Sequence, residues 1–191
     1  MEMTPESSSA AALALLTRYG AKSLDETEAA MVSDGLSFMA GHPDCLYRTC
    51  LLGHLTGSAW IVSPQRDRTL LVHHRKLDRW LQPGGHADGD PDLSAVALRE
   101  AREETGLDFP RLMSPELFDF DRHWIPARGA EPGHWHYDFR FLIEADPKAG
   151  LLLSDESNEL RWFPLKEIEA VARGGSLLRM AEKTVRTTAT S

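Results

Sequence analysis

Three glutamates near the middle of the sequence are spaced so that a helix would place them on one face. They are Glu100, Glu103 and Glu104, within the run REAREETGL. At spacings of i, i+3 and i+4 their carboxylates lie within one turn, where each like-charged pair repels by roughly 0.2–0.5 kcal/mol. The C-terminal end of a helix is itself negative and adds to this repulsion. Carboxylates gathered in this way favour a hard divalent cation such as Mg²⁺; the alternative is an acidic helix end that faces solvent.

The residues around the glutamates predict the helix that carries them. Asp90 suits the N-cap, Pro91 the first helical position and Gly106 a left-handed C-cap. A helix is therefore expected over about residues 91–105. At about 100° per residue, the first and third glutamates continue the apolar stripe that starts at Leu93. Carboxylates that extend an apolar stripe are not simply a solvated face.

The glycines before this helix, together with the helix, resemble the Nudix box, the signature of the Nudix hydrolases. That signature is Gly, five residues, Glu, seven residues, then Arg-Glu-aliphatic-any-Glu-Glu-any-Gly-aliphatic. Its second half fits Arg99–Leu107, with Ala101 in the aliphatic position. One position departs, because the first glutamate counted from Gly85 would fall at Pro91. The resemblance implies an α/β protein with the Nudix-type α/β/α sandwich and a mixed β-sheet, over about residues 45–175.

The resemblance also implies roles for individual residues. Arg99 would orient the glutamates through ion pairs, and one of the glutamates would take a proton from water. Many members add an acidic residue from a loop before a late Trp-containing strand, and Glu156 holds that place here, although an exposed acidic loop is the alternative. The catalytic residues implied are Arg99, Glu100, Glu103 and Glu104. The metal ligands implied are Gly85 through its carbonyl, Glu100, Glu103, Glu104 and Glu156.

The chemistry implied is hydrolysis of a phosphoanhydride. A diphosphate resists nucleophiles because its own charge repels them; Mg²⁺ or Mn²⁺ held by carboxylates would neutralise that charge and activate a water for attack at phosphorus. The expected substrate is a nucleoside diphosphate derivative or a nucleotide. Its identity is not indicated, because the extra motifs that mark NADH, coenzyme A, ADP-ribose or dinucleoside polyphosphate cleavage in some subfamilies are not found.

Four residues are candidates for substrate binding. His86 directly follows the glycines and is expected to contact phosphate or act as a general acid. Further histidines surround the same segments, and His134 and His136 would point the same way in an extended strand. A zinc site is conceivable, but the spacings match no structural zinc pattern and no cysteine assists. The four candidates are Arg75, Trp80, His86 and His136.

The chain divides into an N-terminal helical extension over residues 1–44 and a Nudix domain over residues 45–191 that includes C-terminal helices. The extension is predicted to be a hairpin: one helix begins at Thr4-Pro5-Glu6 and ends at Gly20, and another begins near Ser23 or Asp25 and ends at Gly41. It would pack on the domain, form a homodimer contact or wall the pocket, with packing favoured. The predicted strands are 58–63, 69–73, 117–122, 136–144 and 159–163, followed by helices at 164–173 and 176–184, and Trp80-Leu81-Gln82 leads into the glycines.

The amino-acid composition narrows the class of protein further. The chain has 191 residues and a net charge of −8, which disfavours a general nucleic-acid-binding surface. Two cysteines are too few for a disulfide framework and indicate reduced thiols in a cytoplasmic protein. The first residues are polar and acidic, unlike a signal peptide, and the apolar run Ala10–Leu16 is too short to span a bilayer. We expect a small-molecule diphosphate partner and no membrane partner.

Two other functions remain open. An isopentenyl-diphosphate isomerase uses a related fold but needs a catalytic cysteine beside the pocket. Cys45 and Cys50 precede the first clear strand and therefore suit that role poorly. A non-catalytic Nudix-derived binding or regulatory domain usually loses box glutamates. All three helix glutamates are present here, and Pro91 is the only feature that favours this alternative.

Overall fold

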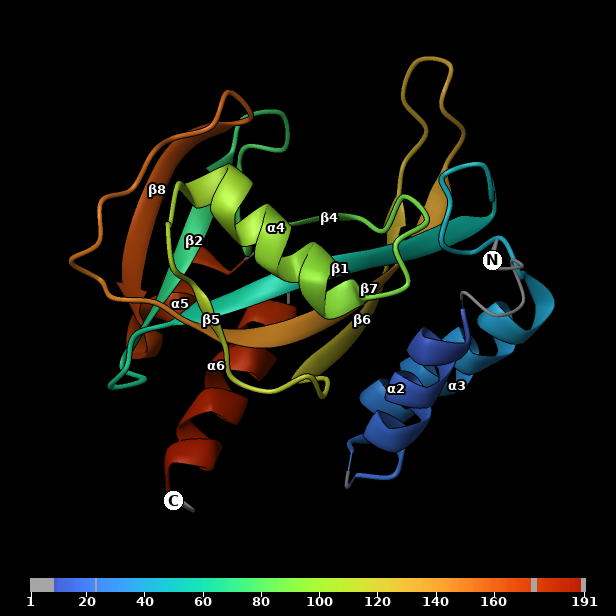
Figure 1. The fold of residues 1–191 in the computed structure, drawn as a ribbon, viewed down its shortest axis with the longest axis horizontal. Coiled ribbons are helices and arrows are strands. Elements are labelled where there is room, and N and C mark those ends of the chain that lie inside the picture. Colours follow the sequence, from blue (N-terminus) through green and yellow to red (C-terminus); the bar gives the residue numbers. More distant parts are fainter. Residues whose placement is uncertain (1–8, 23, 173–174, 190–191) are drawn as a thin grey trace.

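A mixed, curled sheet with helices on both faces forms the centre of the computed structural model, which describes residues 9–22, 24–172 and 175–189 (Figure 1). The strands run in the order β3-β2-β1-β7-β5, while β4 pairs with β1, β6 with β7 and β8 with β2. β1 and β7 are parallel, and the other pairs are antiparallel. The strands are β1 (Gly53–Val62), β2 (Arg68–His74), β3 (Arg79–Leu81), β4 (Gly84–His86), β5 (Arg111–Leu112), β6 (Asp119–Ile125), β7 (His134–Glu144) and β8 (Ser157–Pro164).

Helix α4 (Leu93–Thr105) crosses one face of this sheet and carries the three glutamates. It comes close because β1 has a glycine there: a Cβ on Gly57 would lie 2.7 Å from the Leu93 carbonyl oxygen and 3.0 Å from Val96 Cβ. The opposite face packs on η1 (Leu165–Glu167), α5 (Ile168–Val171) and α6 (Gly175–Ala189). There the Trp60 indole donates a hydrogen bond to Thr184 Oγ1 at 2.8 Å. The predicted α/β/α sandwich is therefore confirmed.

The predicted helical hairpin is present as α2 (Ala10–Gly20) and α3 (Glu26–Gly41). Asp25 is the N-cap of α3, and its side chain accepts a hydrogen bond from the Glu28 amide at 2.8 Å. Both helices share the core on the α4 side of the sheet, where a Cβ on Gly35 would meet Leu16 and Phe120. The proposed first cap Thr4-Pro5-Glu6 and the alternative start at Ser23 lie outside the described residues.

Four local predictions need correction. Helix α4 begins at Leu93 and not at 91, because Asp92 is the N-cap: its carboxylate accepts from the amides of Ser94 and Ala95, both at 3.1 Å. Asp90 instead accepts from the Asp92 amide at 2.9 Å. The glycine loop contains the short strand β4, and β5 was not predicted. The helix expected over 164–173 is only the short η1 and α5.

Buried charges join the sheet to the hairpin and to α6. Arg140 is 2% exposed and contacts Asp119 at 3.1 Å, Asp121 at 3.2 Å and Asp138 at 2.7 Å. Asp119 also accepts from Arg179 and Lys183 of α6, and Lys183 reaches the buried Glu28 of α3. One network of compensated charges therefore connects β6, β7, α3 and α6.

We expect Arg140→Met to lower the free energy of unfolding by about 3–5 kcal/mol, because it leaves buried carboxylates without their cation. Arg18→Met is the matched control, since it removes an exposed ion pair with Glu116 and should cost less than about 1 kcal/mol. Urea unfolding followed by circular dichroism measures both. Equal losses in the two variants would show that the buried network is not a special contributor to stability.

Candidate active site

The Glu104 carboxylate lies directly against the glycine strand. Its Oε1 accepts a hydrogen bond from the Gly84 amide at 2.7 Å, which joins the last turn of α4 to β4. Burial raises the pKa of Glu104 to about 7; the Gly84 hydrogen bond opposes this, and the charges of Glu100, Glu156 and Glu103 add to it. This is a carboxylate held in place with too little positive charge nearby.

Glu100 lies one turn earlier, with its side chain 16% exposed. Arg99 Nη2 lies 3.0 Å from Glu100 Oε1 and also donates to the carbonyl of His86 at 3.2 Å. Burial raises the pKa of Glu100, and the Arg99 cation partly opposes that rise. Arg99 thus makes the ion pair expected from the sequence and links the helix to β4.

Gly85 packs on the Glu100 carboxylate with no space for a side chain. A Cβ at this position would lie 2.5 Å from Oε1 and 2.6 Å from Oε2 of Glu100. The backbone of β4 therefore lies close enough to the carboxylates for both to be ligands of the same metal ion. Glycine is needed at this position because a side chain would not fit. Its backbone conformation does not require glycine, since its φ is not positive.

We expect Gly85→Ala to weaken activation by Mg²⁺ by about 10–100-fold, because the new methyl group displaces the Glu100 carboxylate. Gly150→Ala is the matched control, since its Cβ would lie more than 4 Å from the described residues outside its own neighbourhood. Titration of activity against Mg²⁺ concentration measures both variants. Unchanged activation in Gly85→Ala would contradict the close-packing argument.

The other two predicted acidic ligands are exposed. Glu103 lies on the solvent side of α4, beside the half-buried Glu100 and Glu104. Glu156 immediately precedes β8, and its charge is one of those that raise the pKa of Glu104. The fold therefore brings Gly85, Glu100, Glu103, Glu104 and Glu156 into one region, and their roles remain predictions.

Two of the substrate-binding candidates have other contacts. Arg75 donates to the Ser157 carbonyl at 3.1 Å and to Asn158 Oδ1 at 3.2 Å, so its guanidinium holds the start of β8. Trp80 packs edge-on against Phe163, with ring centroids 4.8 Å apart. Their assignment to substrate binding remains a prediction.

His86 and His136, the other two candidates, lie together in a group of histidines. Their ring centroids are 4.9 Å apart, and His134 Nε2 lies 3.2 Å from His136 Nε2, so the two β7 histidines point the same way as expected. The sequence reasoning missed His54, which is buried and lies beside His136 in the pairing of β1 with β7. Polar residues alternating along β1 at His54, Thr56 and Ser58 were the available signal.

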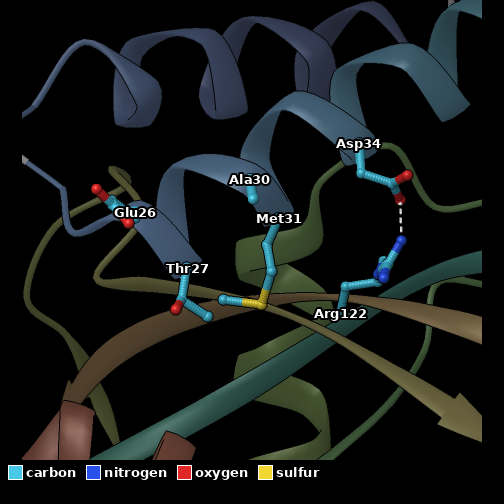
Figure 2. A pocket seen from close by; sticks show the side chains of 6 residues that line it. All are labelled: Glu26, Thr27, Ala30, Met31, Asp34 and Arg122. Atoms are coloured by element: carbon cyan, nitrogen blue, oxygen red, sulfur yellow. Dashed lines mark ion pairs between the residues drawn. The ribbon is translucent and has the colours of Figure 1, made fainter.

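A separate hollow of about 540 Å³ lies between α3 and β6 (Figure 2). Asp34 pairs with Arg122 there at 2.8 Å and accepts from the Tyr137 hydroxyl at 3.0 Å. Its lining comes from α3 and Arg122 and includes none of the box glutamates. This hollow is therefore not the candidate active site.

A sequence model of the NUDIX domain matches residues 54–181. Since this is more than half of the chain, the chain belongs to the Nudix family. The family resemblance found in the box is thereby confirmed.

The curated relatives that match this chain have the names of hydrolases and a tetraphosphatase. The CMP-5'-(N-acetyl-N-hydroxy-3-aminopropyl)phosphonate hydrolase of Streptomyces rubellomurinus is 32% identical over 123 residues, 60% of this chain and 54% of that protein. A probable DHNTP pyrophosphohydrolase of Lactococcus lactis is 32% identical over 108 residues, 56% of this chain and 61% of that protein. The mouse asymmetrical bis(5'-nucleosyl)-tetraphosphatase is 32% identical over 98 residues, 50% of this chain and 59% of that protein. The chain spans less than two thirds of the length of these relatives.

Solved structures share the fold. A Caenorhabditis elegans Ap4A hydrolase in a binary complex has a TM-score of 0.58 at 18% identity, covering 72% of this chain and 98% of that one. The Escherichia coli dihydroneopterin triphosphate pyrophosphohydrolase has a TM-score of 0.55 at 16% identity, covering 68% and 92%. At these identities the likeness establishes the architecture alone.

Two further observations bear on the other expectations. Burial raises the pKa of the Cys45 thiol to about 12 and also raises that of Cys50, so neither cysteine is an activated nucleophile of the kind an isomerase would need. Among the described residues, no helix combines the length and apolar character needed to cross a bilayer.

Proposed function

We propose that this protein hydrolyses a phosphoanhydride bond in a nucleoside diphosphate derivative or a nucleotide, using Mg²⁺ or Mn²⁺. The observation that carries the proposal is the pair of half-buried carboxylates, Glu100 and Glu104, packed against the glycine backbone of β4. Like charges brought together and removed from water favour a cation between them. The family membership and the hydrolase names of the relatives support the same function.

The residues present fit a hard divalent cation. Carboxylate oxygens from three glutamates on α4, the backbone of Gly85 and the exposed Glu156 are the donors that Mg²⁺ and Mn²⁺ prefer. When bound, the ion supplies charge neutralisation at the phosphates and acidifies a water molecule. The raised pKa values of Glu100 and Glu104 indicate that the side chains around them supply too little positive charge on their own.

Contacts within the protein orient the carboxylates. The Gly84 amide fixes the orientation of the Glu104 carboxylate, and Arg99 fixes that of Glu100 while also holding the His86 carbonyl. These contacts set the carboxylates before any ligand arrives, so little reorganisation is needed during the reaction. One of the three box glutamates takes the proton of the attacking water, as the family pattern implies.

The substrate proposal rests on the chemistry shared by the relatives. Their names include a CMP-linked phosphonate, DHNTP and a bis(5'-nucleosyl) tetraphosphate, and the first and third of these carry a nucleoside joined to phosphorus through its 5'-oxygen. The test is a panel of nucleoside triphosphates, nucleoside diphosphate derivatives and dinucleoside polyphosphates, assayed with Mg²⁺, Mn²⁺ or chelator. Metal-dependent release of nucleotide or phosphate from one group supports the proposal; metal-independent release, or silence across the panel, contradicts it.

We expect Glu156→Gln to require roughly tenfold more Mg²⁺ for half-maximal activity, because a ligand charge near Glu104 is lost. The exposed Asp155 beside it provides the control Asp155→Asn, which should leave the Mg²⁺ requirement unchanged. Metal titrations of both variants with the substrate found in the panel measure the effect. If both titrations match that of the wild type, Glu156 is not part of the metal site.

A further inference from the structure

Four histidines from three strands converge beside the glycine strand. They are His54 on β1, His86 on β4, and His134 and His136 on β7. Each offers one ring nitrogen, and these four atoms all lie within 4.8 Å of one another. The ring of His54 lies between 4.7 and 5.0 Å from those of the other three, measured between centroids. We name this group the four-histidine cluster.

His54 is the unusual member of the cluster. It is 3% exposed, and neither of its ring nitrogens makes a hydrogen bond with any residue that the structure describes. A buried polar group without a partner destabilises the folded state, so a fold that keeps one there needs an explanation.

The two β7 histidines already direct ring nitrogens at each other. His134 Nδ1 contacts the Pro132 carbonyl at 3.0 Å, which leaves its Nε2 directed at His136 Nε2, 3.2 Å away.

We propose that the four-histidine cluster binds one Zn²⁺ ion, at a site separate from the carboxylate site on α4. Four nitrogen donors suit zinc or a similar first-row transition metal and do not suit Mg²⁺, which takes oxygen ligands. Tetrahedral Zn–N bonds place the nitrogens about 3.3 Å apart, a spacing that the β7 pair already has. Small movements of the His54 and His86 rings would complete the set.

Such an ion has a structural consequence for the candidate active site. It would tie β4 to β1 and β7 through side chains, in addition to the backbone pairing of β4 with β1. β4 carries the Gly84 amide that holds Glu104 and the Gly85 backbone that packs on Glu100. The zinc ion would therefore fix the strand against which the glutamates are set.

The test uses full-length, tag-free protein stripped of metal and then dialysed with Zn²⁺ in the presence of excess Mg²⁺, which occupies the carboxylate site. We expect about one zinc per chain by elemental analysis, and tetrahedral visible absorption when Co²⁺ replaces Zn²⁺. His54→Gln and His136→Gln, made separately and checked for folding by circular dichroism, should each weaken zinc binding at least about 100-fold in a chelator competition.

Two controls separate this site from other zinc binding. His42→Gln changes a histidine at the end of α3 outside the cluster, and Glu104→Gln changes the carboxylate site; both should keep the full zinc content. Zinc content equal in wild type and both cluster variants would overturn the proposal, as would an octahedral cobalt spectrum or no bound zinc in the wild type. Because the wild-type cobalt spectrum tests the proposal by itself, the experiment still discriminates if a cluster variant fails to fold.

Discussion

Replacing Glu104 with glutamine is expected to lower kcat by about 10²–10⁴-fold while the fold remains intact. Glutamine has the same shape, and its carbonyl can still accept the Gly84 amide hydrogen bond that Glu104 accepts at 2.7 Å. What it removes is the negative charge that would hold the cation and assist proton removal from water. The loss should appear in kcat more than in KM, because the interaction belongs to the reacting centre and not to substrate recognition.

Glu169→Gln is the matched control for this experiment. Glu169 is an exposed glutamate on α5, on the other face of the sheet from α4, so the same substitution there should leave kcat unchanged. Initial rates are measured at saturating Mg²⁺ with the substrate identified by the panel. Wild-type turnover in Glu104→Gln would remove the carboxylate from the catalytic centre and would reopen the non-catalytic interpretation of the Pro91 departure.

The same substitution is expected to stabilise the protein at alkaline pH when chelator is present. The pKa of Glu104 is about 7 in the folded chain against an ordinary value of 4.5. Between these values the folded state binds more protons than the unfolded state, so wild-type stability falls as pH rises. The cost is absent below about pH 4.5 and complete above about pH 7, where it reaches at most about 3 kcal/mol.

In chelator, Glu104→Gln should therefore match the wild type near pH 4.5 and exceed it at pH 8. Adding Mg²⁺ at pH 8 should stabilise the wild type more than the variant, because the ion compensates the buried charge. Urea unfolding across this pH range measures the difference, with Glu169→Gln again as the control. A difference that does not change with pH would mean that the ionisation of Glu104 does not govern stability.

The chemistry of the candidate site could be predicted because it is local in sequence. Glu100, Glu103 and Glu104 lie within one helical turn, and Gly85 is only a short loop away, so periodicity and the family pattern indicate both the helix and its glycine partner. Strands β1, β2 and β7 were predictable for the same reason, since each contains an apolar or alternating run of its own, whereas β4 and β5 have only three and two residues and were missed. The N-cap was wrong because Asp90 and Asp92 are equivalent in type, and only the three-dimensional turn selects Asp92.

What could not be predicted depends on strand pairing. The four-histidine cluster combines residues 54, 86, 134 and 136, and their sequence spacing fits no metal motif because the sheet, and not one loop, brings them together. The same holds for Arg140, whose three carboxylate partners come from β6 and β7. A charged residue inside an alternating strand indicates a partner, but it does not say which strand will provide that partner.

The charged network that joins α3 to α6 also sets an order of events during synthesis. Glu28 and Lys183 are 155 residues apart, and Tyr19 and Lys183 are 164 apart. At about 5–20 residues per second, a ribosome reaches Lys183 roughly 8–30 s after it has made Glu28. Throughout that interval the nascent hairpin has an acidic group without its lysine, so this ion pair can form only after α6 has left the exit tunnel. We expect the first helices of a nascent chain to gain further protease resistance as its last helix emerges.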